Sequence, residues 1–362
     1  MVEWKEIGEI CKPITPPKKI PTKDYLNSGQ FPVIDQGQNM VIAFTNDAST
    51  LVSNDEYVLF GDHTRYVKYF NGSFAQGADG LKILKVKPGI ITRYFYFAFQ
   101  NTEVPTRGYS RHWTIAKALQ IPIPSLAEQE RIVGILDTFT DSIENLKKQI
   151  EQRRKQYEFY RDQLLDLEGK PGVEMKFITD IATNYTGLTY KPENVSENGT
   201  LVLRSSNIEE DKLTFKDSVF VQMNNIPQRA IAKEGDILIC VRNGSKRLVG
   251  KAAMITKEAD GMAFGAFMTV LRASTVNCKY LFYLWQSEKV KKQYKGDDAM
   301  PIAQITSKDF KRIIIPIISL EEQQRIVSIL DKFEASIANL EAQLEQRQKQ
   351  YEYYRNQLLN FE

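Results

Sequence analysis

Residues 126–168 read LAEQERIVGILDTFTDSIENLKKQIEQRRKQYEFYRDQLLDLE, and residues 320–362 read LEEQQRIVSILDKFEASIANLEAQLEQRQKQYEYYRNQLLNFE. The two stretches are identical at 28 of 43 aligned positions, without a gap and with an offset of 194 residues. The segments that precede them are far less alike. A chain arranged as variable part, repeat, variable part, repeat indicates one scaffold that carries two different domains.

Each copy of the repeat predicts a long α-helix. Ser125 with Glu128, and Ser319 with Glu322, match the capping box that opens a helix. No proline interrupts either copy, and Gly134 is the one glycine within them. Apolar residues recur at intervals of three and four, which is the pattern of a coiled-coil seam. At about 1.5 Å per residue, each helix would span roughly 60 Å.

The seam residues of the two copies are equivalent, and one of them in each copy is an arginine. The predicted helix seam contains Leu136, Phe139, Ile143, Leu146, Arg153 and Tyr157 in the first copy, and Leu330, Phe333, Ile337, Leu340, Arg347 and Tyr351 in the second. Each arginine either extends into solvent, or fixes the register by stacking on Tyr351 or Tyr157 of the facing helix or pairing with a glutamate. Because a seam needs a partner helix, we expect the two copies to pair with each other.

The repeat also predicts the organisation of the chain. We expect an α+β fold in which two globular α/β domains are joined by two long antiparallel coiled-coil helices with pseudo-twofold symmetry. The predicted segments are residues 1–124 (first domain), 125–168 (first helix), 169–172 (linker), 173–318 (second domain) and 319–362 (second helix).

Composition favours a cytoplasmic globular protein. Hydrophobic residues make up 42% of the chain, and no run of about 18 apolar residues predicts a membrane span. The first residues do not have the pattern of a signal peptide. Cys11, Cys240 and Cys278 lack CxxC spacing, so we expect reduced thiols and no metal site.

The distribution of charge says more than the net charge of +3. Residues 1–124 contain 14 basic and 11 acidic residues, and residues 173–318 contain 21 and 16, whereas each helical segment has a net charge of −3. Positive domains suit a phosphate-rich ligand such as nucleic acid. Ordinary scatter of surface charge would account for the same modest excess.

Polar loops follow the predicted strands 31–34, 57–60 and 81–86 of the first domain, whereas 90–100 predicts a buried helix or strand. Arginine commonly reads guanine and Gln or Asn reads adenine, while Lys, Ser, Thr and Tyr hold phosphates. The candidate DNA-binding residues of this domain are Gln36, Gln38, Asn39, His63, Thr64, Arg65, Lys68, Arg107, Tyr109 and Arg111. The stretch 62–64 contains Asp and His, but without a repeated metal-binding pattern a loop that contacts DNA or orders the domain is favoured over catalysis.

The second domain has its own polar loops, after predicted strands that end near residues 203 and 241. The Asn-Gly pair at 243–244 favours a tight hairpin turn that presents several cations at its tip. Three cations beside Ser and Asn favour contact with DNA, although a solvated turn is the alternative. The candidate DNA-binding residues are Arg204, Ser205, Asn207, Arg242, Asn243, Ser245, Lys246 and Arg247.

These motifs together resemble a known family. The doubled stretch IPIPSLAEQERIV (121–133) and IPIISLEEQQRIV (315–327) carries the resemblance, with FGDHTR (60–65), GADG (77–80) and RNGSKRLVG (242–250). Over its whole length the chain resembles the specificity (S) subunit of a type I restriction–modification system. One departure within the doubled stretch is Ile318, where the first copy has Pro124.

The resemblance implies a function without catalysis on this chain. Two target-recognition domains would each read one half of a split, gapped sequence in double-stranded DNA, and the helices would fix the gap and dock DNA methyltransferase subunits. A restriction translocase/endonuclease subunit would join them, and S-adenosylmethionine, ATP and Mg would be held by these partners, with no cofactor on this chain. Two other functions remain open: a self-sufficient Mg-dependent DNA nuclease, which needs a carboxylate cluster, and a protein-only coiled-coil scaffold, which would have no salt-dependent affinity for DNA.

Overall fold

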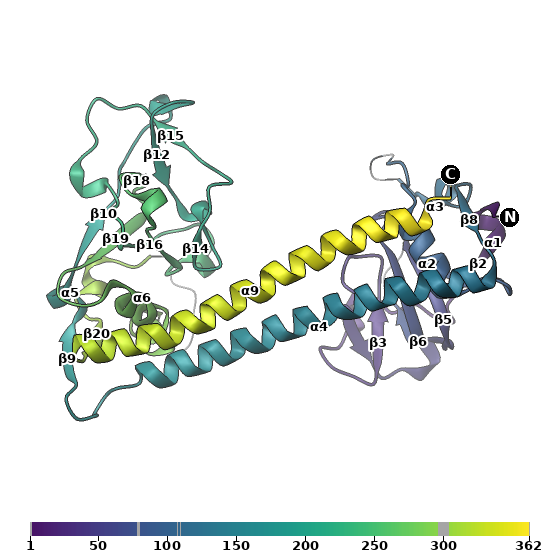
Figure 1. The fold of residues 1–362 in the computed structure, drawn as a ribbon, viewed down its shortest axis with the longest axis horizontal. Helices are drawn as coiled ribbons and strands as arrows, with labels where there is room; N and C mark the ends of the chain where they lie inside the picture. The colour runs from purple at the N-terminus through teal and green to yellow at the C-terminus, as the bar shows by residue number, and fades with distance from the viewer. Residues whose placement is uncertain (1, 78–79, 107, 109, 296–303, 362) are drawn as a thin grey trace. The chain divides into compact units, whose positions relative to one another are not determined.

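The structure is a computed structural model that describes residues 2–77, 80–106, 108, 110–295 and 304–361. The chain forms two compact units, one of residues 1–148 with 341–362 and one of residues 149–340. Two long helices, α4 (Leu126–Leu165) and α9 (Leu320–Leu359), each contribute to both units (Figure 1). Each unit therefore contains one globular domain and one part of each helix.

A mostly antiparallel sheet of six strands forms the main layer of the first domain, among its described residues. In spatial order the strands are β2 (Cys11–Ile14), β7 (Leu81–Val86), β5 (Leu51–Gly61), β6 (Val67–Gln76), β3 (Phe31–Ile34) and β4 (Ala43–Thr45). The predicted strands 31–34 and 81–86 are β3 and β7, and 57–60 lies within β5. Residues 92–101 form the helix α2 (Thr92–Asn101), whose buried aromatic rings pack on the sheet.

Short elements lead from this sheet into α4. Strand β1 (Glu3–Glu6) pairs antiparallel with β8 (Gln120–Ile123), which ends just before the helix. The one-turn helix α1 (Ile7–Ile10) directly follows β1, and the one-turn helix α3 (Trp113–Ala116) precedes β8.

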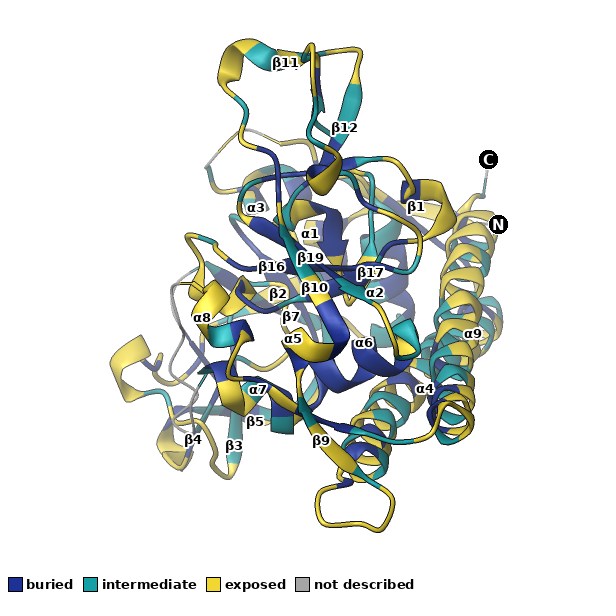
Figure 2. Cartoon of the chain, turned by 90° about the vertical axis from the view of Figure 1, so that its left-hand side faces the viewer, coloured by how far each residue is buried: buried dark blue, intermediate teal, exposed yellow. Residues whose placement is uncertain are grey.

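The second domain contains two four-stranded sheets and a two-stranded ribbon among its described residues. The first sheet has the order β10 (Ala182–Thr186), β19 (Met268–Ala273), β16 (Ile237–Cys240) and β17 (Ala252–Met254). The second has the order β11 (Val195–Ser196), β15 (Phe220–Val221), β12 (Thr200–Leu203) and β18 (Ala263–Phe264), and the ribbon pairs β13 (Ile208–Glu209) with β14 (Lys212–Leu213). Helix α6 (Cys278–Gln286) is almost wholly buried (Figure 2), and α7 (Glu288–Lys295) and α8 (Ser307–Phe310) follow it.

The second unit repeats the framework of the first around the start of its long helix. Strand β9 (Glu174–Phe177) pairs with β20 (Ile314–Ile317), and the one-turn helix α5 (Ile178–Ile181) follows β9 as α1 follows β1. The amide of Ile7 donates to the carbonyl of Leu119 over 2.9 Å, and that of Ile178 donates to Ile313 over the same distance. The two domains thus share their attachment to the helices although their sheets differ.

The long helices pack against each other antiparallel in both units. In the first, Ile132 and Leu136 near the start of α4 share a core with Leu359 at the end of α9. In the second, Leu165 at the end of α4 shares a core with Leu330 near the start of α9. The predicted pairing of the two repeat copies is confirmed.

The seam arginines do not stack on the tyrosines named by the sequence prediction. The guanidinium carbon of Arg347 lies 5.6 Å from the ring centroid of Phe139, and that of Arg153 lies 6.0 Å from the ring centroid of Phe333. Tyr157 and Tyr351 are instead covered by arginines of their own helices. The reason is register: Arg153 and Tyr351 belong to different units, as do Arg347 and Tyr157, and the antiparallel pairing places a phenylalanine beside each seam arginine within its own unit.

Each predicted capping box forms only one of its two hydrogen bonds. The hydroxyl of Ser125 accepts from the amide of Glu128 over 3.4 Å, but the Glu128 carboxylate binds the guanidinium of Arg131 at 2.6 Å and 2.8 Å. The second copy repeats this arrangement with its equivalent residues. A charged partner one turn along the helix therefore outcompetes the cap amide for the carboxylate.

Candidate nucleic-acid interface

Three loops of the first domain meet around Gln36. Its side-chain oxygen accepts from the amide of His63 over 3.0 Å, and its carbonyl accepts from the hydroxyl of Thr64. Gly80 adopts a φ of +97°, and a Cβ there would lie 2.6 Å from the Gln36 amide. A glycine is favoured at this place because a larger residue would be strained at this backbone angle and would displace the Gln36 amide group. The loop after β3, the turn after β5 and the segment before β7 are therefore brought together.

Lys68 faces inward, which corrects its assignment as a DNA-binding residue. Only 6% of Lys68 is exposed, and its ammonium donates to the carbonyls of Asp35 (3.0 Å) and Asn39 (2.5 Å). Burial lowers the pKa of this ammonium group. Lys68 therefore holds the loop of residues 35–39 in shape from beneath. Its side chain points inward because Lys68 pairs with the buried Leu59 of β5, and paired residues share one face of the sheet.

Asp62 and His112 order the first domain. The buried Asp62 carboxylate accepts from the amide of Trp113 over 2.8 Å and lies 3.5 Å from the ammonium of Lys82. Its backbone carbonyl accepts from the amide of His112, also over 2.8 Å. These bonds hold the segment that ends at residue 113 against the turn after β5. The Asp-His pattern at 62–63 thus contributes structure, and sequence reasoning had no signal for the role of His112.

The exposed candidates of the first domain surround this framework. Gln38, Asn39, Thr64, Arg65 and Arg111 are exposed. Arg65, in the left-handed region with a φ of +64°, donates to the carbonyl of Val104 over 3.0 Å. Arg107 and Tyr109 lie outside the described residues.

The Asn-Gly pair of the second domain does not form a tight hairpin. Strand β16 ends at Cys240 and β17 begins at Ala252, so the connection is a loop of residues 241–251. The Asn243 side chain accepts from the amide of Ser245 over 2.9 Å and donates to the hydroxyl of Ser205 over 2.8 Å. Because the asparagine is used in this way, the loop widens and is tied to the loop that follows β12.

The prediction that Asn207 binds DNA is also wrong. It is fully buried, and its amide nitrogen donates to the carbonyls of Thr214 and Asp217 over 3.0 Å and 3.1 Å. Its oxygen accepts from the amide of Arg204 over 2.9 Å. The Arg204 guanidinium is itself paired with the Asp217 carboxylate at 2.8 Å. Both side chains therefore shape the loop after β12, a role that the polar sequence alone does not separate from base reading.

Four exposed candidates remain in the loop after β16, and the structure adds an aromatic residue to them. Arg242, Ser245, Lys246 and Arg247 are exposed. Phe267, in the turn between β18 and β19, is 58% exposed, and the guanidinium carbon of Arg242 lies 5.4 Å from its ring centroid. Sequence reasoning missed Phe267, and the signal available was a large apolar residue directly after Gly265-Ala266.

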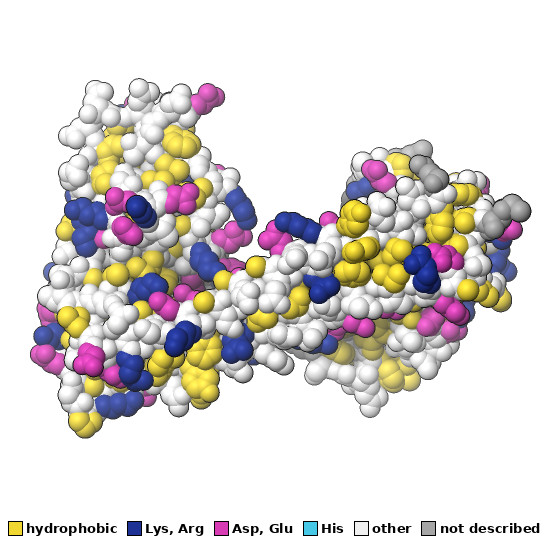
Figure 3. Space-filling model, in the orientation of Figure 1, with side chains coloured by type: hydrophobic (Ala, Val, Ile, Leu, Met, Phe, Trp, Pro, Cys, Tyr) yellow, Lys and Arg dark blue, Asp and Glu magenta, His cyan; other side chains and the backbone are white. Residues whose placement is uncertain are grey.

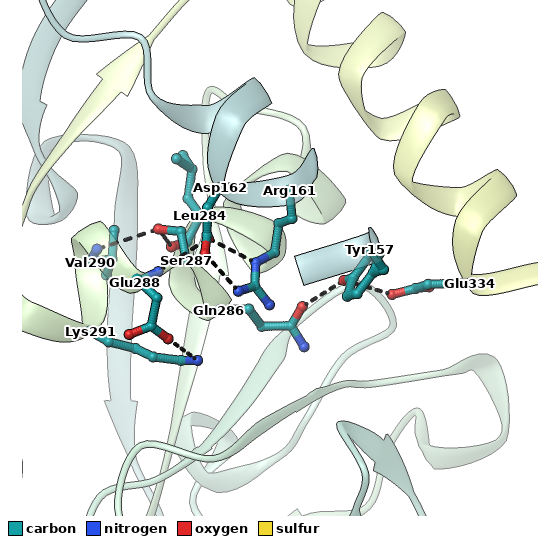
Figure 4. Close-up of polar contacts among 10 residues, drawn as sticks. All are labelled: Tyr157, Arg161, Asp162, Leu284, Gln286, Ser287, Glu288, Val290, Lys291 and Glu334. Atoms are coloured by element: carbon teal, nitrogen blue, oxygen red, sulfur yellow. Dashed lines mark hydrogen bonds and ion pairs between the residues drawn. The ribbon is translucent and has the colours of Figure 1, made fainter. Parts of the chain in front are cut away.

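The second part of α4 is anchored to α6, α7 and α9 by polar contacts within the second unit (Figure 4). The hydroxyl of Tyr157 lies 3.2 Å from the Gln286 side-chain oxygen and 3.3 Å from a Glu334 carboxylate oxygen. Burial raises the pKa of the Glu334 carboxyl group. Nearby, Asp162 pairs with the buried Arg161 at 3.1 Å and accepts from the first amide of α7 over 3.3 Å.

The seam residues fall into two groups by environment. Leu136 and Tyr351 pack against the core of the first domain, and Leu330 and Tyr157 pack against that of the second. The Tyr351 hydroxyl donates to the side chain of Gln100 over 3.0 Å. Ile337 is buried, whereas the other seam residues away from the domains are half-buried: Phe139, Ile143, Leu146, Arg153, Phe333, Leu340 and Arg347.

The same glutamine fastens each long helix to its domain. The side-chain oxygen of Gln129 accepts from the amide of Ile91 over 2.9 Å, and its nitrogen donates to the carbonyl of Pro124 over 3.0 Å. Gln323 repeats both bonds, with the amide of Asn277 and the carbonyl of Ile318. The departure from proline at 318 therefore has no structural consequence here, because only the backbone carbonyl is used.

Acidic and basic side chains are interspersed along the face of the helices that Figure 3 shows. Within the described ranges, no group of three or more His, Cys, Asp and Glu side chains is placed to hold a metal ion. Across those same ranges, every helix is too short or too polar to span a bilayer.

Two different α/β domains, each fastened to an equivalent helix and each carrying a cluster of polar loops, form the arrangement of a protein that reads two separate targets. The model of the type I restriction modification DNA specificity domain matches residues 1–153 and 171–348. The chain belongs to this family of DNA specificity subunits.

Known relatives extend over nearly the whole chain. The EcoR124I/EcoR124II type I restriction enzyme specificity subunit of Escherichia coli is 30% identical over 99% of this chain and 94% of its own length. A putative type I restriction enzyme specificity subunit of Haemophilus influenzae is 28% identical over 99% of this chain and 96% of its own.

Solved structures support the fold. The S subunit of the type I restriction–modification system of M. genitalium matches with a TM-score of 0.60 at 15% identity, over 100% of this chain and 97% of that one. A structure described as the basis of complex assembly and conformational transition of the type I R-M system gives 0.61 at 17% identity, over 99% and 98%. The predicted α+β class with two domains and two long helices is confirmed.

Proposed function

We propose that this chain recognises a split, gapped sequence in double-stranded DNA, one half with each domain, for a type I restriction–modification enzyme. The observation that carries the proposal is the repeated attachment of two unlike domains, each of which gathers exposed cationic and amide side chains into one loop cluster. In the first domain these include Gln38, Asn39 and Arg111, and in the second Arg242 and Arg247. Such groups read base edges and hold phosphates.

Catalysis on this proposal belongs to partner subunits. The chain docks DNA methyltransferase subunits and, in the full enzyme, a restriction translocase/endonuclease, and these partners hold S-adenosylmethionine, ATP and Mg. Family membership supports this division of labour, since the relatives named above are specificity subunits. On the same proposal the protein works in the cytoplasm, where the host DNA lies.

The decisive experiment maps the methylated bases of the host genome with this gene intact and deleted. Loss of one split motif on deletion is the expected result, and it also gives the target sequence. The variant with Gln38→Ala and Asn39→Ala is expected to change only one half of the motif, and the variant with Arg242→Ala and Arg247→Ala only the other. A motif that is unchanged on deletion of the gene contradicts the proposal.

A matched control removes a cation of the second domain outside the loop cluster. Lys289 is paired with Asp166 and Glu168 at 3.0 Å and 2.6 Å, so Lys289→Ala should leave the motif intact.

Each of the two competing functions predicts a different result with the purified protein. A nuclease would cut DNA with Mg in the absence of partners, and a protein-only scaffold would show no fall of DNA affinity with salt, whereas each phosphate contact steepens the log–log slope by about 0.9.

A further inference from the structure

Phe267 is a large apolar residue that is mostly exposed. It occupies the turn between β18 and β19, and 58% of the residue is exposed, whereas its neighbours Phe264 and Met268 are buried. A single exposed apolar residue is common on protein surfaces and by itself indicates nothing. Evidence for a function of this ring must therefore come from the residues around it.

The backbone of this turn is fixed on both sides. The carbonyl of Phe267 accepts two hydrogen bonds, from the amides of Val241 (3.0 Å) and Arg242 (3.2 Å). The amide of Gly265 donates to Leu203 over 2.9 Å. The exposed ring is thus held at one place between the loop after β12 and the loop after β16, both of which carry predicted DNA-binding residues.

The ring and Arg242 form one unit. The guanidinium carbon lies 5.4 Å from the ring centroid, within the range of a cation–π contact. In the part of the chain that the structure describes, no carboxylate pairs with this guanidinium. The stacked ring therefore limits the freedom of an exposed arginine, a side chain whose planar group can present several hydrogen-bond donors to a ligand.

We propose, on the basis of the proposed function, that Phe267 determines specificity by contacting the 5-methyl group of a thymine while it positions Arg242 on a neighbouring guanine. The thymine methyl is the one apolar group that base edges present in the major groove, and arginine most often reads guanine there. The separation of 5.4 Å is less than two base-pair steps of about 3.4 Å each. On this proposal the half-target of the second domain contains a T·A pair next to a G·C pair.

The first test is the target sequence itself. Once the methylation map gives the motif, variants at Arg242 identify the half read by the second domain. A half without adjacent T·A and G·C pairs overturns this inference and leaves the proposed function standing. Absence of any sequence-dependent methylation would instead contradict the proposed function.

The second test removes the methyl group alone. Each thymine of both half-targets is replaced in turn by deoxyuridine, and the affinity of the full chain with its methyltransferase subunits is measured by fluorescence anisotropy. One replacement in the half read by the second domain should weaken binding about fourfold, the value of one buried methyl group. Phe267→Ala should weaken binding to the thymine duplex and abolish the difference between thymine and uracil, with no effect on replacements in the other half.

Phe267→Leu separates the two roles of the ring. A leucine keeps an apolar contact but not the stacking on Arg242, so it should retain a thymine preference while discrimination of guanine against adenine at the adjacent pair falls. Thermal melting of both variants shows whether the domain is intact. If thymine and uracil bind equally to the wild-type complex, or if the preference survives in Phe267→Ala, methyl readout by Phe267 is wrong. The ring could also insert between base pairs, which would contradict methyl readout. In that case 2-aminopurine placed in the half-target, which is quenched in the free duplex, would become fluorescent on binding only when Phe267 is present.

Discussion

The ring of Phe139 stacks on that of Tyr354, with centroids 5.3 Å apart and an angle of 28° between the ring planes. The equivalent residues of the repeat, Phe333 and Tyr160, stack at 5.5 Å with the same angle. Each pair joins α4 to α9, one in each unit. The helix pairing therefore uses one contact twice, because the repeat supplies both partners of both pairs at a constant offset.

Loss of either phenylalanine should destabilise the unit that contains it. Phe139→Ala and Phe333→Ala each remove a half-buried ring that contacts both a tyrosine and an arginine. We expect the free energy of unfolding to fall by roughly 2 kcal/mol in each case, below the range for a fully buried phenylalanine. Denaturant unfolding measures this. Asn145→Ala, on an exposed position of the same helix, should change it by less than about 0.5 kcal/mol, and equal effects would count against the stacked pairs.

The seam arginines should fix the register of the two helices at some cost to the stability of the protein. Arg153→Leu combined with Arg347→Leu replaces two half-buried guanidinium groups by apolar side chains, and we expect the melting temperature to rise. The distribution of distances between spin labels at positions 145 and 348 of the first unit should broaden as register control is lost. The lysine variants keep the charge without the planar group and serve as the comparison. A distribution that stays narrow in the leucine variant would show that the arginines do not fix the register.

Glu334 should make the second unit less stable at high pH. Burial raises the pKa of its carboxyl group above the value in the unfolded chain, so the folded state retains its proton to higher pH. The stability linked to this group is complete below the unfolded pKa and is lost as the pH rises through the folded pKa. The groups that face it are Tyr157, Tyr283, Asp331 and Lys279.

Glu334→Thr tests this effect with the residue found at the equivalent position of the first copy, Thr140. The variant should melt a few degrees higher than the wild type at pH 8, and the difference should shrink at pH 5. Glu352→Gln, at an exposed position of α9, should show no such dependence. An advantage of Glu334→Thr that is the same at both pH values would contradict the titration.

The ion pair of Asp236 should contribute strongly to the stability of the second domain. Its carboxylate, which is 2% exposed, binds the guanidinium of Arg272 through two bonds of 2.7 Å and the amide of Lys233 over 2.8 Å. Asp236→Ala leaves a cation and an amide without their partner, at a cost of about 3 kcal/mol. Chemical denaturation provides the value. The exposed pair of Glu209 with Lys216 is the control, since Glu209→Ala should cost no more than about 0.5 kcal/mol.

Shortening both helices should shorten the unread gap of the DNA target. Removal of residues 144–150 and 338–344 deletes one heptad from each helix and preserves both stacked pairs of Phe139 and Phe333. Each helix loses about 10 Å, which corresponds to roughly three base pairs at about 3.4 Å each. The methylated motif of the variant measures the gap. Deletion from one helix only should lower stability instead, and an unchanged gap in the double deletion would refute the role of the helices as a spacer.

The sequence predicts the scaffold well because the scaffold is periodic. Apolar spacing and a gapless repeat suffice to place α4 and α9 and to infer that they pair. The predicted partner of Arg153, Tyr351, was wrong because heptad position gives the face of a residue but not the register of an antiparallel pair. Tyr351 lies in the first unit, where its hydroxyl donates to Gln100, and Phe333 is the ring beside Arg153 in the second unit.

The sequence indicates which loops are rich in polar residues, but not which of those side chains are exposed. Lys68 and Asn207 have the chemistry of DNA-binding residues, yet both are buried and hold backbone carbonyls. Whether a polar side chain points outward depends on loop closure by distant residues, and that information is absent from local sequence. Phe267 was missed for the converse reason, since an apolar residue near a strand is ordinarily part of the core.

The constant offset of the repeat has a genetic consequence. A crossover between the coding segments of the two copies, at any pair of equivalent codons, removes 194 codons and leaves one continuous helix with its heptad phase intact. A crossover with the same repeat of another gene would exchange one domain in the same frame, and the glutamine that fastens each domain here, Gln129 or Gln323, uses only backbone groups of that domain. On the proposed function, a single recombination within the repeat therefore exchanges the reader of one whole half-target, without a series of point mutations that would each have to preserve folding.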